Sequence, residues 1–306
     1  MSARISITLE EMVVLKAEAR GFSFLPRQPV SSLLSGKHAS RLRGRGLTFE
    51  ELRHYHAGDD IRLIDWKATA RLRSTHVRVF KEERERPVLL IVDQRTPMFF
   101  GSRRAMKSVV AAELTALGAW RTLDTDDRVG GIIFNEQEIS EVRPHRSQSR
   151  VLQLFHEVSR FNKALTEEPQ PRGNVQLNDA LAAALQVARH DYLVVLISDL
   201  DGADAETKRL ATLIAARNDM LVVAVYDPLG ASLIGSFGMV ATDRGRSWDI
   251  PAERAFADHF QQSFQNRVHE WVDIFRNLKV PVMPISTAAP AVEQIRSLFG
   301  QRGASR

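Results

Sequence analysis

Five short apolar runs dominate the hydrophobic pattern, and all of them follow Arg86. These runs are Val88–Val92, Val129–Phe134, Leu193–Ile197, Leu221–Val225 and Val280–Ile285. Several are continuous rather than alternating, which is typical of parallel strands that are covered on both faces. We therefore expect each run to form a buried strand.

Apolar residues recur at helical spacing between these runs. The four sets are Met106, Val109, Val110, Leu114, Leu117 and Leu123; Leu181, Leu185 and Ala188; Leu210, Leu213 and Ile214; and Phe256, Phe260, Phe264, Val268, Trp271, Phe275 and Leu278. Strands that alternate with helices are joined by right-handed crossovers. Residues 86–300 are thus expected to form an α/β domain with a doubly wound, mostly parallel sheet.

The first 85 residues follow a different pattern and predict an N-terminal extension of irregular and α+β structure. Thr8–Arg20 predicts a helix, with Thr8 as N-cap and Glu11 at the capping-box spacing. His76–Phe80 alternates polar and apolar residues, as a half-exposed strand does. Farther along, Gly235–Ile250 predicts a hairpin inserted in the sheet domain, with its turn at Asp243–Gly245.

Composition indicates a globular protein, since hydrophobic residues make up 44% and charged residues 26% of 306 residues. The chain contains no cysteine, which excludes disulfides, zinc–thiolate sites and thiol catalysis. Its N-terminus lacks the apolar core of a signal peptide, and no window reaches ~18 apolar residues. We therefore expect a soluble, cytoplasmic protein.

The basic excess is confined to one segment. Residues 37–86 contain 13 basic and 8 acidic residues, which gives the whole net charge of +5, and the remainder balances at 29 against 29. Such a patch favours an acidic partner. Nucleic-acid binding through residues 37–86 is an alternative, although the segment is rich in acids as well.

Three acids directly follow apolar runs, at Asp93, Asp199 and Asp227. Ligands of open α/β sheets gather at the carboxyl ends of strands, and two carboxylates there could hold a divalent metal. The alternative is that each aspartate caps the next turn or helix.

The densest polar cluster follows Arg43, and it admits two interpretations. His54 and His56, near Asp59 and Asp60, could bind a metal. Alternatively, five charged residues form a paired knot around Trp66 as a hydrophobic anchor; they are Asp59, Asp60, Arg62, Asp65 and Lys67. No phosphate loop, serine nucleophile elbow or HExxH motif occurs.

This cluster resembles a known family. The run from Gly44 to Arg71, with its GDD-x-R-x-IDW core, followed by VFKEERERPVLLIVD, is similar to the signature of the bacterial "domain of unknown function 58" family. The matching signature positions are Gly44, Gly46, Arg53, Tyr55, Gly58, Asp59, Asp60, Arg62, Asp65, Trp66 and Arg71.

The resemblance implies a von Willebrand factor A-like domain with a metal-ion-dependent adhesion site. Asp93 and Asp199 match two of five ligand positions, whereas Arg95, Pro97 and Val175 replace the two serines and the threonine. We expect no cofactor, because Mg²⁺ needs near-octahedral oxygen ligation. Two roles for Arg95 remain open. It pairs inward with Asp93, or it meets an acidic partner on an interaction surface made of Arg95, Thr96, Asp199 and Asp201.

The resemblance also implies a partner. Family members are associated with MoxR-type AAA+ ATPases and are thought to act as adaptors in assembling or activating other complexes. We therefore expect a non-enzymatic interaction protein that works with such an ATPase on a client protein. The alternative enzyme would be a metal-dependent hydrolase that uses Asp93 and Asp199 with His54 or His56.

Overall fold

The computed structural model divides into two compact units. It describes residues 3–20, 47–82, 86–166, 173–231, 240–243, 246–249, 275 and 278–300. Unit 1 contains residues 1–30 and 86–306, and unit 2 contains residues 31–85. The N-terminal residues thus belong with the sheet, whereas the sequence pattern placed the boundary after residue 85.

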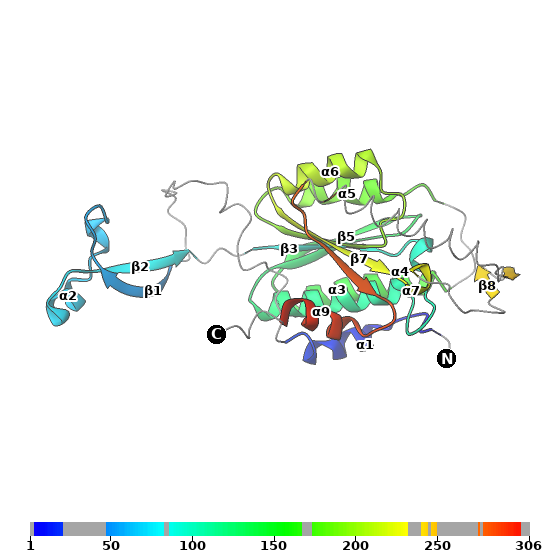
Figure 1. Ribbon diagram of the computed structural model, residues 1–306, viewed down its shortest axis with the longest axis horizontal. Helices are drawn as coiled ribbons and strands as arrows, with labels where there is room; N and C mark the ends of the chain where they lie inside the picture. Colours follow the sequence, from blue (N-terminus) through cyan, green and yellow to red (C-terminus); the bar gives the residue numbers. More distant parts are fainter. Residues whose placement is uncertain are drawn as a thin grey trace. The chain divides into compact units, whose positions relative to one another are not determined.

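Unit 1 is built around a six-stranded sheet in the order β10-β7-β6-β3-β4-β5 (Figure 1). The strands are β3 (Val88–Asp93), β4 (Val129–Phe134), β5 (Ile139–His145), β6 (Leu193–Ser198), β7 (Asp219–Tyr226) and β10 (Val282–Ser286). Five of them run parallel, and β5 pairs antiparallel with β4 at one edge. The prediction of a doubly wound, mostly parallel sheet is confirmed.

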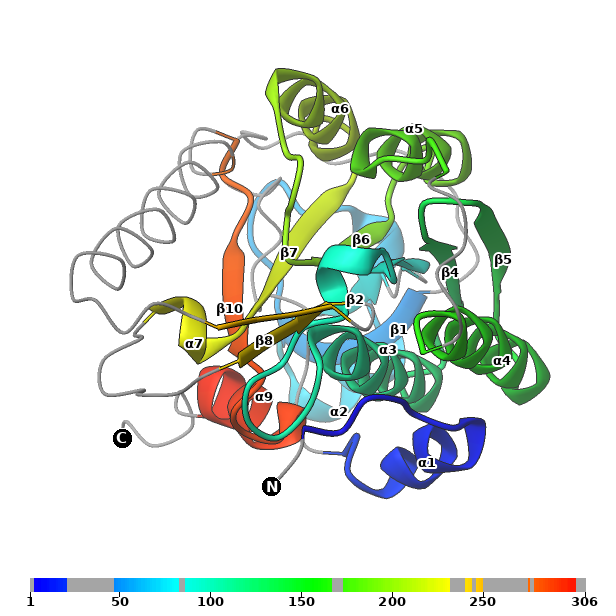
Figure 2. The same cartoon turned by 90° about the vertical axis from the view of Figure 1, so that its right-hand side faces the viewer.

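Helices cover both faces of this sheet (Figure 2). One face packs against α1 (Leu9–Val14), α3 (Lys107–Asp124), α4 (Gln148–Ala164) and α9 (Ala291–Gly300), and the other against α5 (Leu177–Val187) and α6 (Ala205–Ala215). Alternate strand residues enter opposite layers: Leu90 and Val92 lie in one apolar cluster, and Leu89 and Ile91 in the other. This two-sided burial explains the continuous apolar runs.

The two edge strands differ most from the sequence pattern. Strand β10 carries Pro284, which an edge strand tolerates because one side of its backbone needs no ladder partner. Strand β5 was missed, because only Val142 of its seven residues is buried. A strand with so little apolar surface gives no run for the sequence pattern to detect.

The predicted N-terminal helix is confirmed over a shorter span, α1, which a 3₁₀ turn, η1 (Leu15–Ala17), continues. Thr8 and Glu11 form the expected capping box. Two distant side chains bind this segment: Trp120 Nε1 donates to the Met12 carbonyl at 3.0 Å, and Asn162 Oδ1 accepts from the Ile7 amide at 3.0 Å. These contacts fix residues 3–20 on unit 1.

The predicted hairpin is confirmed by β8 (Val240–Asp243) and β9 (Arg246–Asp249), which pair antiparallel after α7 (Pro228–Ala231). Residues 244–245 of its turn lie outside the described residues. Most of the helical stripe predicted from Phe256 to Leu278 also lies outside them, although Phe275 is buried in the core. None of the helices described is long and apolar enough to cross a membrane.

Unit 2 is a hairpin with two short helical elements (Figure 1). Strands β1 (Leu47–His54) and β2 (His76–Glu82) pair antiparallel, and between them lie η3 (Ile61–Leu63) and α2 (Trp66–Leu72). The prediction of a strand at His76–Phe80 is confirmed.

Candidate functional site

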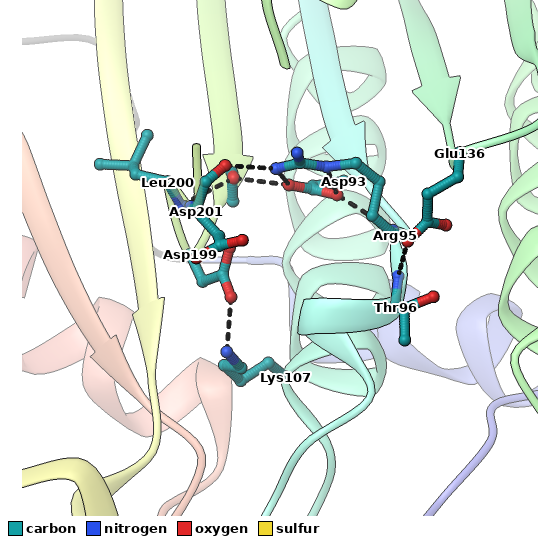
Figure 3. Close-up of polar contacts among 9 residues, drawn as sticks. Asp93, Arg95, Thr96, Lys107, Glu136, Asp199, Leu200 and Asp201 are labelled. Atoms are coloured by element: carbon teal, nitrogen blue, oxygen red, sulfur yellow. Dashed lines mark hydrogen bonds and ion pairs between the residues drawn. The ribbon is translucent and has the colours of Figure 1, made fainter. Parts of the chain in front are cut away.

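Asp93 is the centre of a buried ion pair at the carboxyl end of β3 (Figure 3). Its side chain is fully buried, and Arg95 donates to both carboxylate oxygens, from Nε to Oδ1 at 3.0 Å and from Nη2 to Oδ2 at 2.7 Å. The Ser198 hydroxyl donates to Oδ2 at 2.7 Å. Because both oxygens receive directed, charge-assisted bonds, this carboxylate is held in one orientation.

Arg95 points inward and joins two loops. Its Nη2 also donates to the Asp201 carbonyl at 3.0 Å, and its guanidinium carbon lies 5.3 Å from the centre of the Phe134 ring. Burial lowers the pKa of Arg95, but the neighbouring carboxylates, Asp93 foremost and then Asp199 and Asp201, together raise the pKa overall. Burial raises the pKa of Asp93, and Arg95 opposes that shift.

The outward role considered for Arg95 does not agree with this geometry. The residue is 3% exposed, and its guanidinium is used by Asp93 and Asp201. The physical reason is the cost of leaving Asp93 buried without a counter-charge, which the adjacent loop residue removes. Arg95 is therefore an internal counter-ion rather than an exposed contact.

A second cation neutralises Asp199. Lys107 Nζ lies 2.5 Å from Asp199 Oδ2, and the two side chains are 13% and 8% exposed (Figure 3). Asp199 Oδ1 accepts from the Asp201 amide at 3.0 Å. The sequence reasoning missed Lys107, because it begins α3 and lies 92 residues from its partner in the chain.

The loop after β6 is folded tightly to make these contacts. Leu200 has a φ of 59° and Gly202 a φ of 77°, both in the left-handed region. The Leu200 amide donates to the Ser198 hydroxyl oxygen at 2.9 Å, which accounts for the turn. Leu200 itself is fully buried, so packing of its side chain holds the unusual backbone in place.

Glu136 connects the loop after β3 with the loop before α5, which contain the replaced metal-ligand positions Pro97 and Val175. Its Oε1 accepts from the Thr96 amide at 2.7 Å, and its backbone carbonyl accepts from the Val175 amide at 3.1 Å. A Cβ atom at Gly173 would lie 1.7 Å from that carbonyl oxygen, so only glycine allows this approach. Glu136 was also missed, since no strand-end pattern distinguishes it.

The residues at this end of the sheet do not fit a divalent cation. Both remaining carboxylates already have a protein cation, Arg95 for Asp93 and Lys107 for Asp199. Pro97 lies in the 3₁₀ turn η4 (Thr96–Met98), and Val175 packs against the apolar layer of α5. Proline and valine have no side-chain oxygen, so neither residue can be a metal ligand through its side chain. Among the residues described, no three histidine or acidic side chains are grouped to hold a metal.

Asp227 acts as a cap, which was one of the two interpretations of acids after strands. It accepts from the Ser102 amide at 2.8 Å and from the Leu229 amide at 2.9 Å. The Ser102 and Thr287 hydroxyls also donate to it. Asp227 therefore fixes three chain segments at the end of β7.

The signature residues of unit 2 form local turns. Arg53 donates two bonds to Asp59, at 2.7 and 2.8 Å, and the His56 amide donates to the same carboxylate at 2.8 Å. Gly58 completes this turn with a φ of 108°, which favours glycine. The Tyr55 amide donates to the Thr75 carbonyl at 2.9 Å and continues the hairpin pairing.

Further signature residues shape the segment that follows. Asp60 accepts from the Arg62 amide at 2.9 Å, and Asp65 caps α2 through the Ala68 amide at 2.9 Å and binds Arg78 at 2.8 Å. Gly44 and Gly46 lie outside the described residues.

The predicted charge knot is wrong in its partners and in its centre. Asp59 and Asp65 pair with strand arginines, whereas no ion pair joins Arg62 or Lys67 to another described residue. Trp66 is 70% exposed, so it is not a hydrophobic anchor. The reason is that unit 2 has only a small core. The residue of α2 that contacts the hairpin is Thr69, whose Oγ1 accepts from the His76 amide at 3.0 Å.

The two histidines considered as metal ligands belong to a different unit from the strand-end acids. The His54 ring lies 4.4 Å from the His76 ring, and His56 is exposed in the turn that Asp59 closes. Both belong to unit 2, whereas Asp93 and Asp199 belong to unit 1. The residue set of the alternative hydrolase is therefore divided between the units.

The strand order, the antiparallel edge strand and the two helical layers define a doubly wound α/β domain in unit 1. A family model described as "Protein of unknown function DUF58" matches residues 51–270, more than half of the chain. The protein belongs to this family.

Two mycobacterial proteins are similar to this chain over most of its length. The uncharacterized protein Rv1480 of Mycobacterium tuberculosis is 26% identical over 276 residues, which cover 89% of this chain and 85% of the relative. The uncharacterized protein Mb1516 of Mycobacterium bovis matches with the same figures. Among solved structures, the crystal structure of the SpRpn10 VWA domain is similar, with a TM-score of 0.41 and 11% identity over 70% of this chain and 95% of that chain.

Proposed function

We propose that this protein is a non-enzymatic adaptor that binds other proteins through the strand-end loops of unit 1 without a metal ion. In this proposal it works in the cytoplasm with a MoxR-type AAA+ ATPase in assembling or activating a client complex. The carrying observation is that Arg95 and Lys107 form ion pairs with Asp93 and Asp199, the two carboxylates expected to hold a divalent cation. Such a loop face keeps its shape and charge balance without metal.

The use of the strand-end acids supports a binding role over catalysis. Asp93, Asp199 and Asp227 each accept several bonds from within unit 1. A general base must reach a substrate proton, and carboxylates held by internal donors are poorly placed for that. The resemblance of the signature block supports the ATPase as partner.

The absence of a metal requirement can be tested by titration calorimetry with Mg²⁺ and Mn²⁺. We expect no saturable binding below about 1 mM, since the two carboxylates are already paired. A variant with three oxygen ligands rebuilt, Arg95→Ser/Pro97→Ser/Val175→Thr, serves as a matched comparison for the method. Micromolar binding by the unaltered chain that disappears in Asp93→Ala would overturn the proposal.

The loop face can be tested with the purified MoxR-type ATPase of the same cell. Arg103 is exposed in the loop between β3 and α3, at the carboxyl end of the strands. Its matched control is Arg189, which is exposed just before β6 and therefore at the opposite, amino-terminal end. We expect Arg103→Glu to weaken binding about tenfold and Arg189→Glu to leave it unchanged, because interface charges act locally. Equal affinities of the two variants would remove the loop face from the interface.

A further inference from the structure

Exposed apolar side chains are concentrated in unit 2. Ten large hydrophobic residues of the described chain are exposed, and five of them lie in this small unit. The five are Leu52 at 37%, Ile61 at 67%, Leu63 at 41%, Trp66 at 70% and Leu72 at 53%. Exposed apolar side chains mark an interaction surface where they are gathered in one patch.

Helix α2 orders part of this surface into two rows. Trp66 and Ala70 are one turn apart and exposed, and so are Lys67 and Arg71. Residues four apart in a helix are neighbours on its surface, so an apolar row lies beside a cationic row. We call these four residues the α2 face.

The cations of the α2 face form no ion pair within the part of the chain that the structure describes. Neither Lys67 nor Arg71 forms an ion pair with a described residue, and the same holds for Arg62 and Arg73 on either side of the helix. Between Ile61 and Arg73 there are four basic residues and one acid, Asp65, which caps α2 and binds Arg78. As far as the described residues go, the surface therefore offers positive charge without an ion-pair partner around an exposed tryptophan.

This chemistry fits a protein segment better than a nucleic acid or a lipid surface. Tryptophan and arginine are the residues most enriched among the energetically dominant contacts of protein interfaces. The described part of unit 2, residues 47–82, has seven basic and six acidic residues, a balance too even for binding to a polyanion. Carboxylates beside a large apolar side chain would complement both rows at once.

We propose that the α2 face docks a partner protein segment that carries acidic residues next to one or two large apolar side chains. Trp66 supplies the apolar contact, and Lys67 and Arg71 pair with the partner's carboxylates. This second surface lies in unit 2 and is independent of the loop face of unit 1, so either can fail without the other.

The test uses the full chain and a phage-displayed library of random 12-residue peptides. We expect the selected peptides to be rich in Asp and Glu around Leu, Phe or Trp. The most enriched peptide is then synthesised and its affinity measured by fluorescence polarisation. Trp66→Ala and Lys67→Glu/Arg71→Glu should each weaken it about tenfold or more, as truncation of dominant interface residues does.

Helix α6 provides matched controls, because Leu213 is 46% exposed and Lys208 is also exposed on it. Leu213→Ala and Lys208→Glu should change the affinity by less than about twofold. Selected peptides without an acidic excess, or equal binding by Trp66→Ala, would overturn the proposal.

Other occupants of the α2 face give distinct results, and each overturns it. Binding to phosphatidylglycerol vesicles or to single-stranded DNA that Lys67→Glu/Arg71→Glu abolishes, with no acidic peptide selected, would assign the face to those ligands. Self-association in sedimentation that Trp66→Ala abolishes would assign it to a second copy. A large fall in melting temperature in Trp66→Ala would show that the same chain covers it.

Discussion

The two units differ in how far they bury their apolar and charged side chains. In unit 1 the strands β3, β4 and β6 are buried along their whole length, and even the acids at their ends are held by internal cations. In unit 2, among the side chains described, only His76 and Val77 are buried. Nevertheless the segment with the GDD-x-R-x-IDW core, on which the family resemblance was based, lies in unit 2. A signature therefore need not mark a core; here it marks turns and an exposed helix.

Two tryptophans show the contrast most directly. Trp120 is fully buried, donates to the Met12 carbonyl and packs edge-on against Phe155 with ring centres 5.4 Å apart. Trp66 is 70% exposed on α2. A tryptophan is thus part of the core in unit 1 and lies on the surface in unit 2.

The largest expected effect is a difference in stability between the alanine variants of these two tryptophans. Trp120→Ala should lower the free energy of unfolding by about 3–5 kcal/mol, because it creates a cavity and leaves the Met12 carbonyl unpaired. Trp66→Ala should change it by less than about 0.5 kcal/mol, as other exposed substitutions do. Urea unfolding followed by circular dichroism measures both. Similar losses in the two variants would show that the units do not differ in this way.

Unit 1 was largely predictable from the sequence, because burial on both faces of a parallel sheet leaves continuous apolar runs. Strand β5 was not, since one buried residue, Val142, gives no period. The carboxylates of the site were predictable as strand-end acids. Their counter-ions were only partly so: Arg95 lies two residues from Asp93, but Lys107 reaches Asp199 only through the fold.

Unit 2 was less predictable for a different reason. Its charged residues were predicted to pair with one another, but the partners of Asp59 and Asp65 come from the strands, at Arg53 and Arg78. Strand register decides these pairs, and spacing along the chain does not reveal it. Trp66 was expected inside because large aromatics usually are, and only the small size of the unit's core leaves it outside.

A second prediction concerns the buried ion pair of unit 1. Arg95→Met should lower the free energy of unfolding by about 3 kcal/mol, because the Asp93 carboxylate loses its only guanidinium while remaining buried. Differential scanning calorimetry or urea unfolding measures this loss.

The control removes both charges. Asp93→Asn/Arg95→Met should recover at least half of the lost stability, since no charge then remains buried without a partner. A double variant that is as unstable as the two single changes added together would mean that each residue acts separately. Arg95 would then be more than a counter-ion of Asp93.

The smallest expected effect is the pH dependence of unit 2, and it depends on the half-buried pair of Arg53 and Asp59. Hydrogen bonds from Arg53 and from the His56 amide lower the pKa of Asp59 to about 2. A carboxyl group with a lowered folded-state pKa stabilises the fold above its unfolded pKa of about 3.9, and this contribution is lost as the pH falls through about 2. The hairpin should therefore melt at progressively lower temperature between about pH 4 and pH 2.

Thermal unfolding followed through the Val77 amide signal in NMR reports on unit 2 alone. Asp59→Asn should flatten this pH dependence, whereas Asp60→Asn, which removes a carboxylate bonded to the Arg62 amide rather than to an arginine side chain, should retain it. If both variants keep the slope of the unaltered chain, the Arg53–Asp59 pair does not determine how unit 2 responds to acid.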